Sequence, residues 1–169
     1  MSNESGNNSD ARRPTQSDVS WALHQLVVAA AAMDVSLGHR LSLSPVEYQA
    51  MKHLMTADNA YGTVELGNLV GLSSGAATGL VDRLENAGHL QRVKDPRDRR
   101  RLILEPTDDA VRRTAEQLRP LEQRLNDILS DYRADERDVI ARFLTETTGA
   151  YRSFSGQEPA DVDADDGNP

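Results

Sequence analysis

The segment that decides the fold is GLSSGAATGLVDRLENAGHLQRVKDPRDRRRLILEPT, residues 71–107. Its first half repeats apolar residues at the i, i+3, i+4, i+7 spacing of an amphipathic helix, namely Ala77, Leu80, Val81 and Leu84. Ser73 or Ser74 is suited to cap the start of this helix, and Gly88 to end it. We therefore expect a short helix followed by a turn.

A second helix precedes it. In residues 63–70, Leu66, Leu69 and Val70 share one face, and Gly67 is small enough to let another helix cross closely. Gly71 supplies the left-handed residue that ends this helix. Two helices joined by a tight glycine-containing turn form the helix-turn-helix pattern.

The second half of the segment predicts a β-hairpin. Residues 90–94 read as one strand and residues 100–104 as its return, and Asp95-Pro96 suits the first two positions of a type I turn. Four arginines lie at or beside the tip, at positions 97, 99, 100 and 101. A hairpin after a helix-turn-helix makes a winged helix.

Longer helices flank this unit. A capping box at residues 44–47, with proline at the first helical position, opens a helix before the helix-turn-helix. Apolar residues at helical spacing predict helices over residues 17–37, from Thr107 to about 133 with a kink at Pro120, and over 135–154. Their apolar stripes need burial, and a second copy of the chain supplies it most simply. We predict a mainly α fold, a winged helix-turn-helix with long N- and C-terminal dimerisation helices.

Charge is distributed unevenly along the 169 residues. The net charge is −8, yet residues 83–101 hold seven Lys or Arg against three Asp or Glu. A polyanion responds to this local field rather than to the sum. The polar segments 1–16 and 156–169, the latter acidic, are predicted to be disordered. The absence of cysteine, of a signal peptide and of an apolar run long enough to span a bilayer favours a cytoplasmic protein without a membrane partner.

The segment quoted above resembles the multiple antibiotic resistance regulator (MarR) family of bacterial transcription factors. The family wing carries Asp-Pro-x-Asp-Arg-Arg before an apolar strand that ends near a threonine, and residues 95–100 and Thr107 match it, as do Leu80–Leu84 and Gly88 before the wing. The resemblance covers residues 17–155, with the winged helix at about 44–106 and dimerisation helices at about 17–37 and 107–155. It implies a homodimer on a pseudo-palindromic DNA operator, usually as a repressor, that a small aromatic or anionic effector releases in many members.

The expected DNA contacts follow from this resemblance. Ser73, Ser74 and Thr78 would face the major groove, while the small residues 75, 76 and 79 suggest that DNA shape also contributes to specificity. Arg83 would contact a phosphate or form an ion pair on the helix surface. These contacts belong to the helix-turn-helix.

The wing would contribute the remaining contacts. Arg99 or Arg100 would enter the minor groove, with Arg97 and Arg101 on phosphates. Asp98 would orient an arginine by a charge-assisted bond. The alternative is a solvated charged hairpin.

The sequence gives weaker signals for other kinds of functional site. Trp21, His24, Met51 and Met55 would line an effector pocket, although ordinary core packing explains the methionines equally well. No two histidines have the i, i+3 or i+4 spacing that would pair metal ligands on one helix, so we expect no metal and no cofactor. Without a phosphate loop or nucleophile elbow, an enzyme is not expected. The alternative function is a winged-helix module that binds nucleic acid non-specifically or binds protein.

Overall fold

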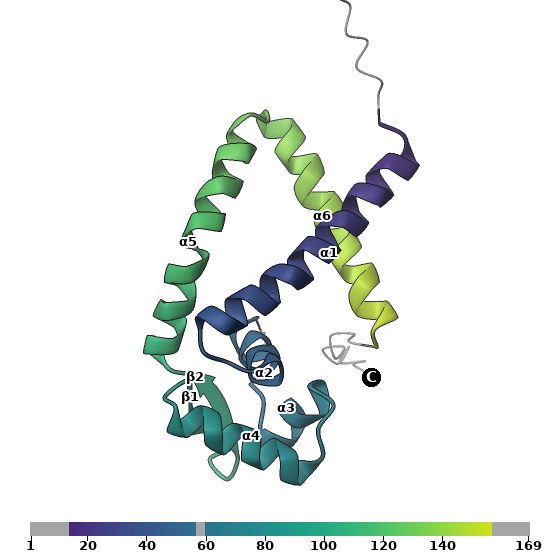
Figure 1. Cartoon of the computed structure of the whole chain (residues 1–169). Helices are drawn as coiled ribbons and strands as arrows, with labels where there is room; N and C mark the ends of the chain where they lie inside the picture. The colour runs from purple at the N-terminus through teal and green to yellow at the C-terminus, as the bar shows by residue number, and fades with distance from the viewer. Residues whose placement is uncertain (1–13, 57–59, 157–169) are drawn as a thin grey trace, which may run out of the picture. The chain divides into compact units, whose positions relative to one another are not determined.

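The computed structural model describes residues 14–56 and 60–156. Its elements are labelled in Figure 1 and follow in the order α1 Gln16–Arg40, α2 Pro45–Thr56, α3 Thr63–Leu69, α4 Ser74–Asn86, β1 Leu90–Lys94, β2 Leu102–Pro106, α5 Asp108–Ser130 and α6 Ala134–Phe154. The described residues thus form six helices and one two-stranded antiparallel hairpin, which confirms the predicted fold class. Most of both tails predicted to be disordered lies outside the described residues.

The chain divides into two compact units. Residues up to Gln117 form the N-terminal unit, and residues from Leu118 form the C-terminal unit. Helix α5 contributes to both. The two units are described separately below.

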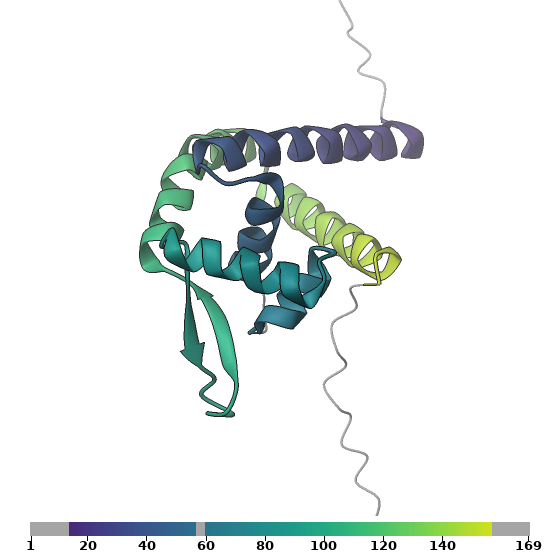
Figure 2. The same ribbon diagram turned by 60° about the horizontal axis from the view of Figure 1, so that its bottom comes forward.

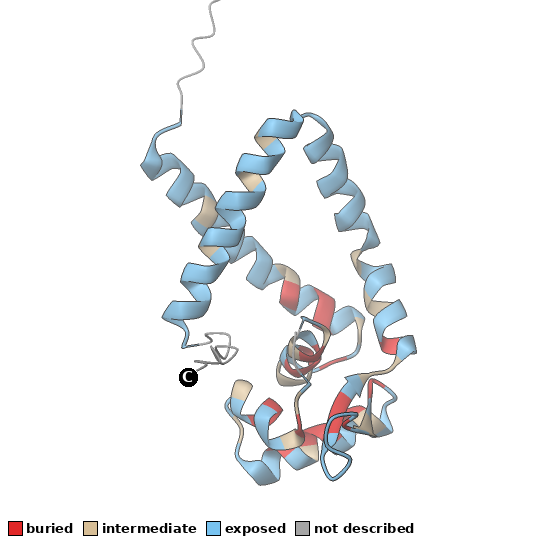
Figure 3. Ribbon diagram, turned by 180° about the vertical axis from the view of Figure 1, so that it is seen from behind, coloured by how far each residue is buried: buried red, intermediate tan, exposed pale blue. Residues whose placement is uncertain are grey.

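The core of the N-terminal unit lies where α2, α3 and α4 pack with the hairpin. Figure 3 shows buried positions concentrated on these elements. The largest fully buried side chains are Leu66, Leu80, Val81, Leu84 and Leu90. They come from α3, α4 and β1, so the helix-turn-helix and the wing share one core.

Helices α3 and α4 cross closely because Gly67 lacks a side chain. A β-carbon placed on Gly67 would lie 2.4 Å from the β-carbon of Ala77, which is itself fully buried. The predicted close crossing is confirmed. Gly71 and Gly88 end α3 and α4 with φ angles of +71° and +72°, the left-handed conformation expected of them.

The predicted cap of α5 is present, and the predicted capping box of α2 is present in its Glu47 half. Ser44 donates from its hydroxyl and its N–H to one carboxylate oxygen of Glu47, at 2.7 and 3.0 Å, at the start of α2. Thr107 accepts the N–H of Ala110 at 3.2 Å at the start of α5 and donates its hydroxyl to the carbonyl of Gly88. Thr107 therefore anchors α5 to the end of α4.

The hairpin projects away from the helices of its unit (Figure 2). Strand β1 has the predicted bounds, but β2 begins two residues later than expected, because Leu90 pairs with Pro106 and Lys94 with Leu102. The hydrogen-bonded turn also differs from the prediction. It spans Asp98 to Arg101, whose N–H donates to the Asp98 carbonyl at 2.9 Å.

Helix α1 is attached to α2 by a buried carboxylate. Asp34, only 9% exposed, accepts the hydroxyl of Tyr48 at 3.0 Å and the ammonium of Lys52 at 2.5 Å. Burial and the Asp34 carboxylate raise the pKa of Tyr48 to about 12. The tyrosine is therefore a neutral hydrogen-bond donor at physiological pH.

Among the described helices, α1 alone has the length and composition to cross a membrane, with a mean hydropathy of 1.3 over its most apolar stretch. One such helix is weak evidence for a membrane span, because helices of soluble proteins meet the same criterion. Most of its apolar side chains are exposed, Trp21 to 61%.

Candidate nucleic-acid interface

The outer face of α4 is polar and small. Ala77, Leu80, Val81 and Leu84 turn into the core, whereas Ser74 and Thr78 are exposed. Ser73 occupies the N-cap position, and its side chain makes no capping hydrogen bond. Its hydroxyl and the N–H groups of the first turn of α4 are thus available to an acceptor such as a phosphate oxygen.

Glycines keep this face of α4 open. A β-carbon on Gly75 would meet no atom within 4 Å, and one on Gly79 would meet only the guanidinium of Arg83, at 3.6 Å. The Thr78 hydroxyl donates to the carbonyl of Ser74 at 3.0 Å, which directs its methyl group away from that carbonyl. Because Gly75 and Gly79 have no side chains, the base edges in a major groove can approach the backbone of α4 closely.

Two aspartates fold the tip of the hairpin through backbone hydrogen bonds. Asp95, 8% exposed, accepts the N–H of Arg97 at 2.8 Å, and Asp98 accepts the N–H of Arg100 at 3.0 Å. Asp98 thus supports the wing through the backbone of Arg100, a contact that the sequence analysis did not anticipate. These bonds present successive arginine side chains outward.

The arginines of the wing differ in their partners. Arg97, Arg99 and Arg100 are exposed, and none of them has an ion pair within the described part of the chain. Arg101 instead donates to Glu65 of α3 at 2.7 Å and to the carbonyl of Ala60 at 3.3 Å. Three guanidinium groups at the tip are therefore uncompensated, while the fourth is tied to the body of the unit.

Arg83 also has a carboxylate partner. Its Nε donates to Glu47 of α2 at 3.1 Å, although the Arg83 side chain remains 61% exposed. The ion pair predicted as an alternative for Arg83 is thus formed with another helix, to a residue 36 positions away in the sequence. Exposed ion pairs contribute little to stability and exchange readily, so Arg83 keeps the capacity to bind an anion.

Arg92 of β1 is a residue that the sequence analysis missed. Its guanidinium binds both Glu85 and Asp82 on α4, the latter at 2.6 Å. The i, i+3 spacing of these carboxylates followed by an arginine on the next strand was the available signal. Arg92 thus offsets one of the two negative charges that Asp82 and Glu85 place on α4.

The four residues expected to form an effector pocket have different surroundings. Trp21 and His24 stack on α1 with ring centroids 5.5 Å apart and are exposed. Met51 is 2% exposed in the core, and Met55 is half-buried. Core packing, the alternative considered above, describes Met51.

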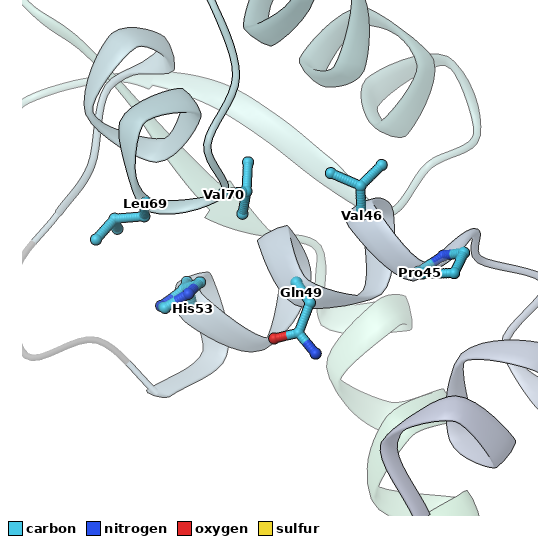
Figure 4. Close-up of a pocket in the computed structure, with 6 residues that line it drawn as sticks. All are labelled: Pro45, Val46, Gln49, His53, Leu69 and Val70. Carbon is cyan, nitrogen blue, oxygen red and sulfur yellow. The ribbon is translucent and has the colours of Figure 1, made fainter. Parts of the chain in front are cut away.

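A separate pocket lies between α2 and α3 (Figure 4). Its volume is about 340 Å3, and none of the four expected effector residues lines it; the lining residues are Pro45, Val46, Gln49, His53, Leu69 and Val70. Burial, together with the neighbouring Lys52 ammonium, lowers the pKa of His53, which is therefore neutral at physiological pH. The pocket is mostly apolar with two neutral polar groups.

Within the described residues, no three His, Asp or Glu side chains cluster as a metal site would require. His89, 8% exposed, lies between α4 and β1. Burial, and then the charge of Arg113, lower its pKa. It is a neutral core histidine.

Comparison with known proteins gives a consistent assignment. Residues 43–102 match the model of the MarR family. The chain is 41% identical over 80 residues to the uncharacterized HTH-type transcriptional regulator YcgE of Bacillus subtilis strain 168, covering 47% of this chain and 52% of that protein. The chain spans about half the length of the curated relatives it matches.

Solved structures show the same fold. A MarR family protein from Bacillus stearothermophilus matches with a TM-score of 0.54 and 22% identity over 80% of this chain and 96% of its own. The transcriptional regulator Tm0710 from Thermotoga maritima matches with a TM-score of 0.59 and 20% identity over 82% and 97%. The MarR resemblance and the winged-helix fold predicted from the sequence are confirmed.

Proposed function

Starting from a winged helix that matches the MarR family, we propose that this protein is a DNA-binding transcriptional regulator that acts as a homodimer. The observation that carries the proposal is the juxtaposition, in one compact unit, of an open polar helix face and a hairpin tip with three uncompensated arginines. Relatives described as transcriptional regulators support a regulatory rather than an enzymatic role.

Helix α4 is the proposed reader of the major groove. Ser73, Ser74 and Thr78 supply hydroxyls to base edges or phosphates, and the glycines at 75 and 79 let the helix approach closely. Few of these groups make bidentate contacts to a base. Specificity therefore rests partly on the shape and deformability of the DNA.

The wing is the proposed reader of the minor groove. Arg99 or Arg100 enters the groove, where narrow A·T tracts concentrate negative potential, and Arg97 lies on a phosphate. Arg83 and Arg101 contact phosphates only by exchanging their ion pairs with Glu47 and Glu65. We accordingly expect them to contribute less than the unpaired arginines.

Dimerisation is proposed through the flanking helices, over the domain bounds 17–37 and 107–155 given above. Each of these helices carries exposed apolar side chains of the kind that a partner chain covers, among them Trp21, Val28, Leu125, Ile128, Phe143 and Phe154. Exposed apolar patches of this kind mark interaction sites. A symmetric partner would bury the same faces on both chains.

The finer features of the function are proposals by resemblance. We propose a cytoplasmic repressor on a pseudo-palindromic operator, released by a small aromatic or anionic effector. Trp21 and His24 remain its proposed contacts. An effector acts only if it binds the DNA-competent and incompetent dimers unequally. The absence of cysteine excludes a thiol switch within this sequence.

Substitution of the wing arginines tests the proposal. We expect Arg99→Ala and Arg100→Ala each to weaken binding to a selected duplex roughly tenfold or more and to reduce the slope of log K against log salt by about one. The control is Arg119→Ala, which removes another exposed arginine, from α5, and should leave both quantities unchanged. Unchanged binding in both wing variants, with the fold intact, would contradict the proposed role.

A further inference from the structure

The hairpin is attached to the rest of the N-terminal unit at one cross-strand pair, Arg92 and Leu104. We call the part of the hairpin around this pair the stem of the wing. In an antiparallel ladder, alternate pairs direct their N–H groups away from the partner strand. Here the N–H of Leu104 donates to the carbonyl of Tyr61 at 2.8 Å, and the N–H of Arg92 donates to the carboxylate of Glu85 at 3.3 Å. At this pair, one edge of the hairpin is thus attached to α4 and the other edge to Tyr61, which lies just before α3.

Glu85 makes the stronger of these two attachments. It accepts the backbone N–H of Arg92 with one oxygen and binds the Arg92 guanidinium with the other. The same guanidinium binds Asp82, one turn earlier on α4, at 2.6 Å. A charged pair with two points of contact fixes an orientation as well as a distance.

We propose that Glu85 is a positioning residue for DNA reading, which holds the wing at a fixed angle to the recognition helix α4. This role rests on the DNA-binding function proposed above. In this role, Glu85 itself does not contact DNA. It acts by placing Arg99 and Arg100 at the minor groove while α4 occupies the major groove.

The length of the hairpin makes the angle important. The tip lies roughly 15 Å beyond the level of Arg92, at about 3.4 Å per strand residue. A tilt of about 10° at the stem would move the tip by about 3 Å, which is close to the separation of successive base pairs along one strand. A loosened stem would therefore misplace the wing arginines by one base step.

Electrostatics and the positioning role predict opposite changes in DNA affinity when Glu85 is removed. Glu85 is an acid on the helix that faces DNA, so its removal should strengthen binding to a polyanion if electrostatics alone decides. Arg92 would keep its ion pair with Asp82. If Glu85 positions the wing, its removal should instead weaken specific binding.

The experiment measures duplex binding and its salt dependence for Glu85→Ala, with Glu105→Ala as the matched control. Glu105 is an exposed acid on β2 opposite Gln91, and its side chain has no hydrogen bond or ion pair within the described residues. We expect Glu85→Ala to bind roughly tenfold more weakly and with a lower salt slope, because the misplaced wing arginines no longer make their contacts with the DNA. We expect Glu105→Ala to bind equally or more tightly. Equal or tighter binding by Glu85→Ala would overturn the proposal.

A distance measurement tests the same role without DNA. The chain has no cysteine, so Asn68→Cys on α3 and Arg97→Cys at the tip provide the two spin-label sites of each chain. An excess of unlabelled chain isolates the distance within one chain of the proposed dimer. We expect a narrow distance distribution that broadens in Glu85→Ala and, to a lesser extent, in Glu85→Gln, which keeps an acceptor for the N–H of Arg92. An unchanged width in folded variants would overturn the proposal.

The two measurements separate the possible failures. If the unaltered chain bound no duplex, the proposed function and the positioning role in DNA reading would both fall. If it bound duplex with a steep salt dependence while Glu85→Ala behaved as the control does, only the positioning role would fall.

Discussion

At the scale of single residues, three helices of the N-terminal unit end in the same way. In α1, α3 and α4, the N–H three residues beyond the last helical residue donates back across the last turn, as Leu43 does to Gly38, Leu72 to Gly67 and His89 to Leu84. This is the Schellman arrangement, which requires a left-handed residue at the end of the helix. Glycine fills that position in α3 and α4, whereas α1 has Ser42 at a φ of 58°.

Ser42 therefore carries a backbone strain that the two glycines avoid. We expect Ser42→Gly to raise the free energy of unfolding by about 0.5–1 kcal/mol, since a side chain in the left-handed region is disfavoured. The converse control is Gly88→Ala. A β-carbon there would meet no atom within 4 Å, so its expected loss of about 1 kcal/mol is purely conformational. Chemical denaturation measures both, and a less stable Ser42→Gly would contradict the assignment.

Sequence reasoning at this scale succeeded where the residue type is itself the signal. Gly67, Gly71, Gly88 and Thr107 all have the roles predicted for them, and Ser44 forms half of its predicted capping box. It did not find Ser42, because serine has no strong preference for the left-handed region. Nor did it find the partners of Arg83 and Arg101, which lie 36 positions away in the sequence and come close only on folding.

At the scale of elements, the crossing of α3 and α4 determines how the helix-turn-helix packs. We expect Gly67→Ala to lower the free energy of unfolding by about 1–3 kcal/mol, because the added methyl group would overlap Ala77 in a closed core. The matched control is Gly75→Ala, where the new methyl group meets nothing within 4 Å and helix propensity improves. Thermal unfolding distinguishes them. Equal stabilities would show that the crossing is not tight.

Glu47 links α2 to α4 and makes this link sensitive to acid. Burial of the Glu47 carboxyl group alone would raise its pKa. Hydrogen bonds from Ser44 and Arg83 outweigh this effect and hold the pKa of Glu47 below its ordinary value. Because the folded-state pKa is the lower one, the ionised carboxylate stabilises the fold. Its contribution is fully present above the ordinary glutamate pKa and is lost as the pH falls through the folded-state pKa.

We therefore expect the melting temperature of the unaltered protein to fall more steeply than that of Glu47→Gln as the pH is lowered from about 5 to 3. The variant has no carboxylate to protonate at this position, so the difference between the two curves should shrink towards acid pH. Parallel curves over this range would contradict the role of Glu47. Differential scanning calorimetry at several pH values provides the measurement.

The bounds of the two strands show what the sequence pattern predicts correctly and what it does not. Strand β1 was predicted at its observed bounds, because Leu90 and Gly88 mark its start. Strand β2 was predicted two residues early, since the run of arginines has no apolar alternation to reveal the register. The ladder from Leu90–Pro106 to Lys94–Leu102 fixes it, and hydrogen bonds of Asp95 and Asp98, which are invisible in the pattern, absorb the extra residues into the turn.

At the scale of the whole molecule, the acidic composition and the basic wing are compatible. Carboxylates near the proposed interface are mostly paired: Asp82 and Glu85 with Arg92, Glu47 with Arg83 and Glu65 with Arg101. The three unpaired arginines at the tip then dominate the local field. The net charge of −8 therefore describes the body of the protein rather than its proposed DNA-binding surface.

The most direct test of the central claim is a selection of bound sequences from a random duplex library with the purified full chain, followed by a salt titration on the selected site. We predict a pseudo-palindrome whose half-sites lie about 10 base pairs apart, as a homodimer would require, and an affinity that falls steeply with salt. A well-folded protein that enriched no sequence, and whose duplex binding did not depend on salt, would contradict the assignment of this winged helix as a DNA reader.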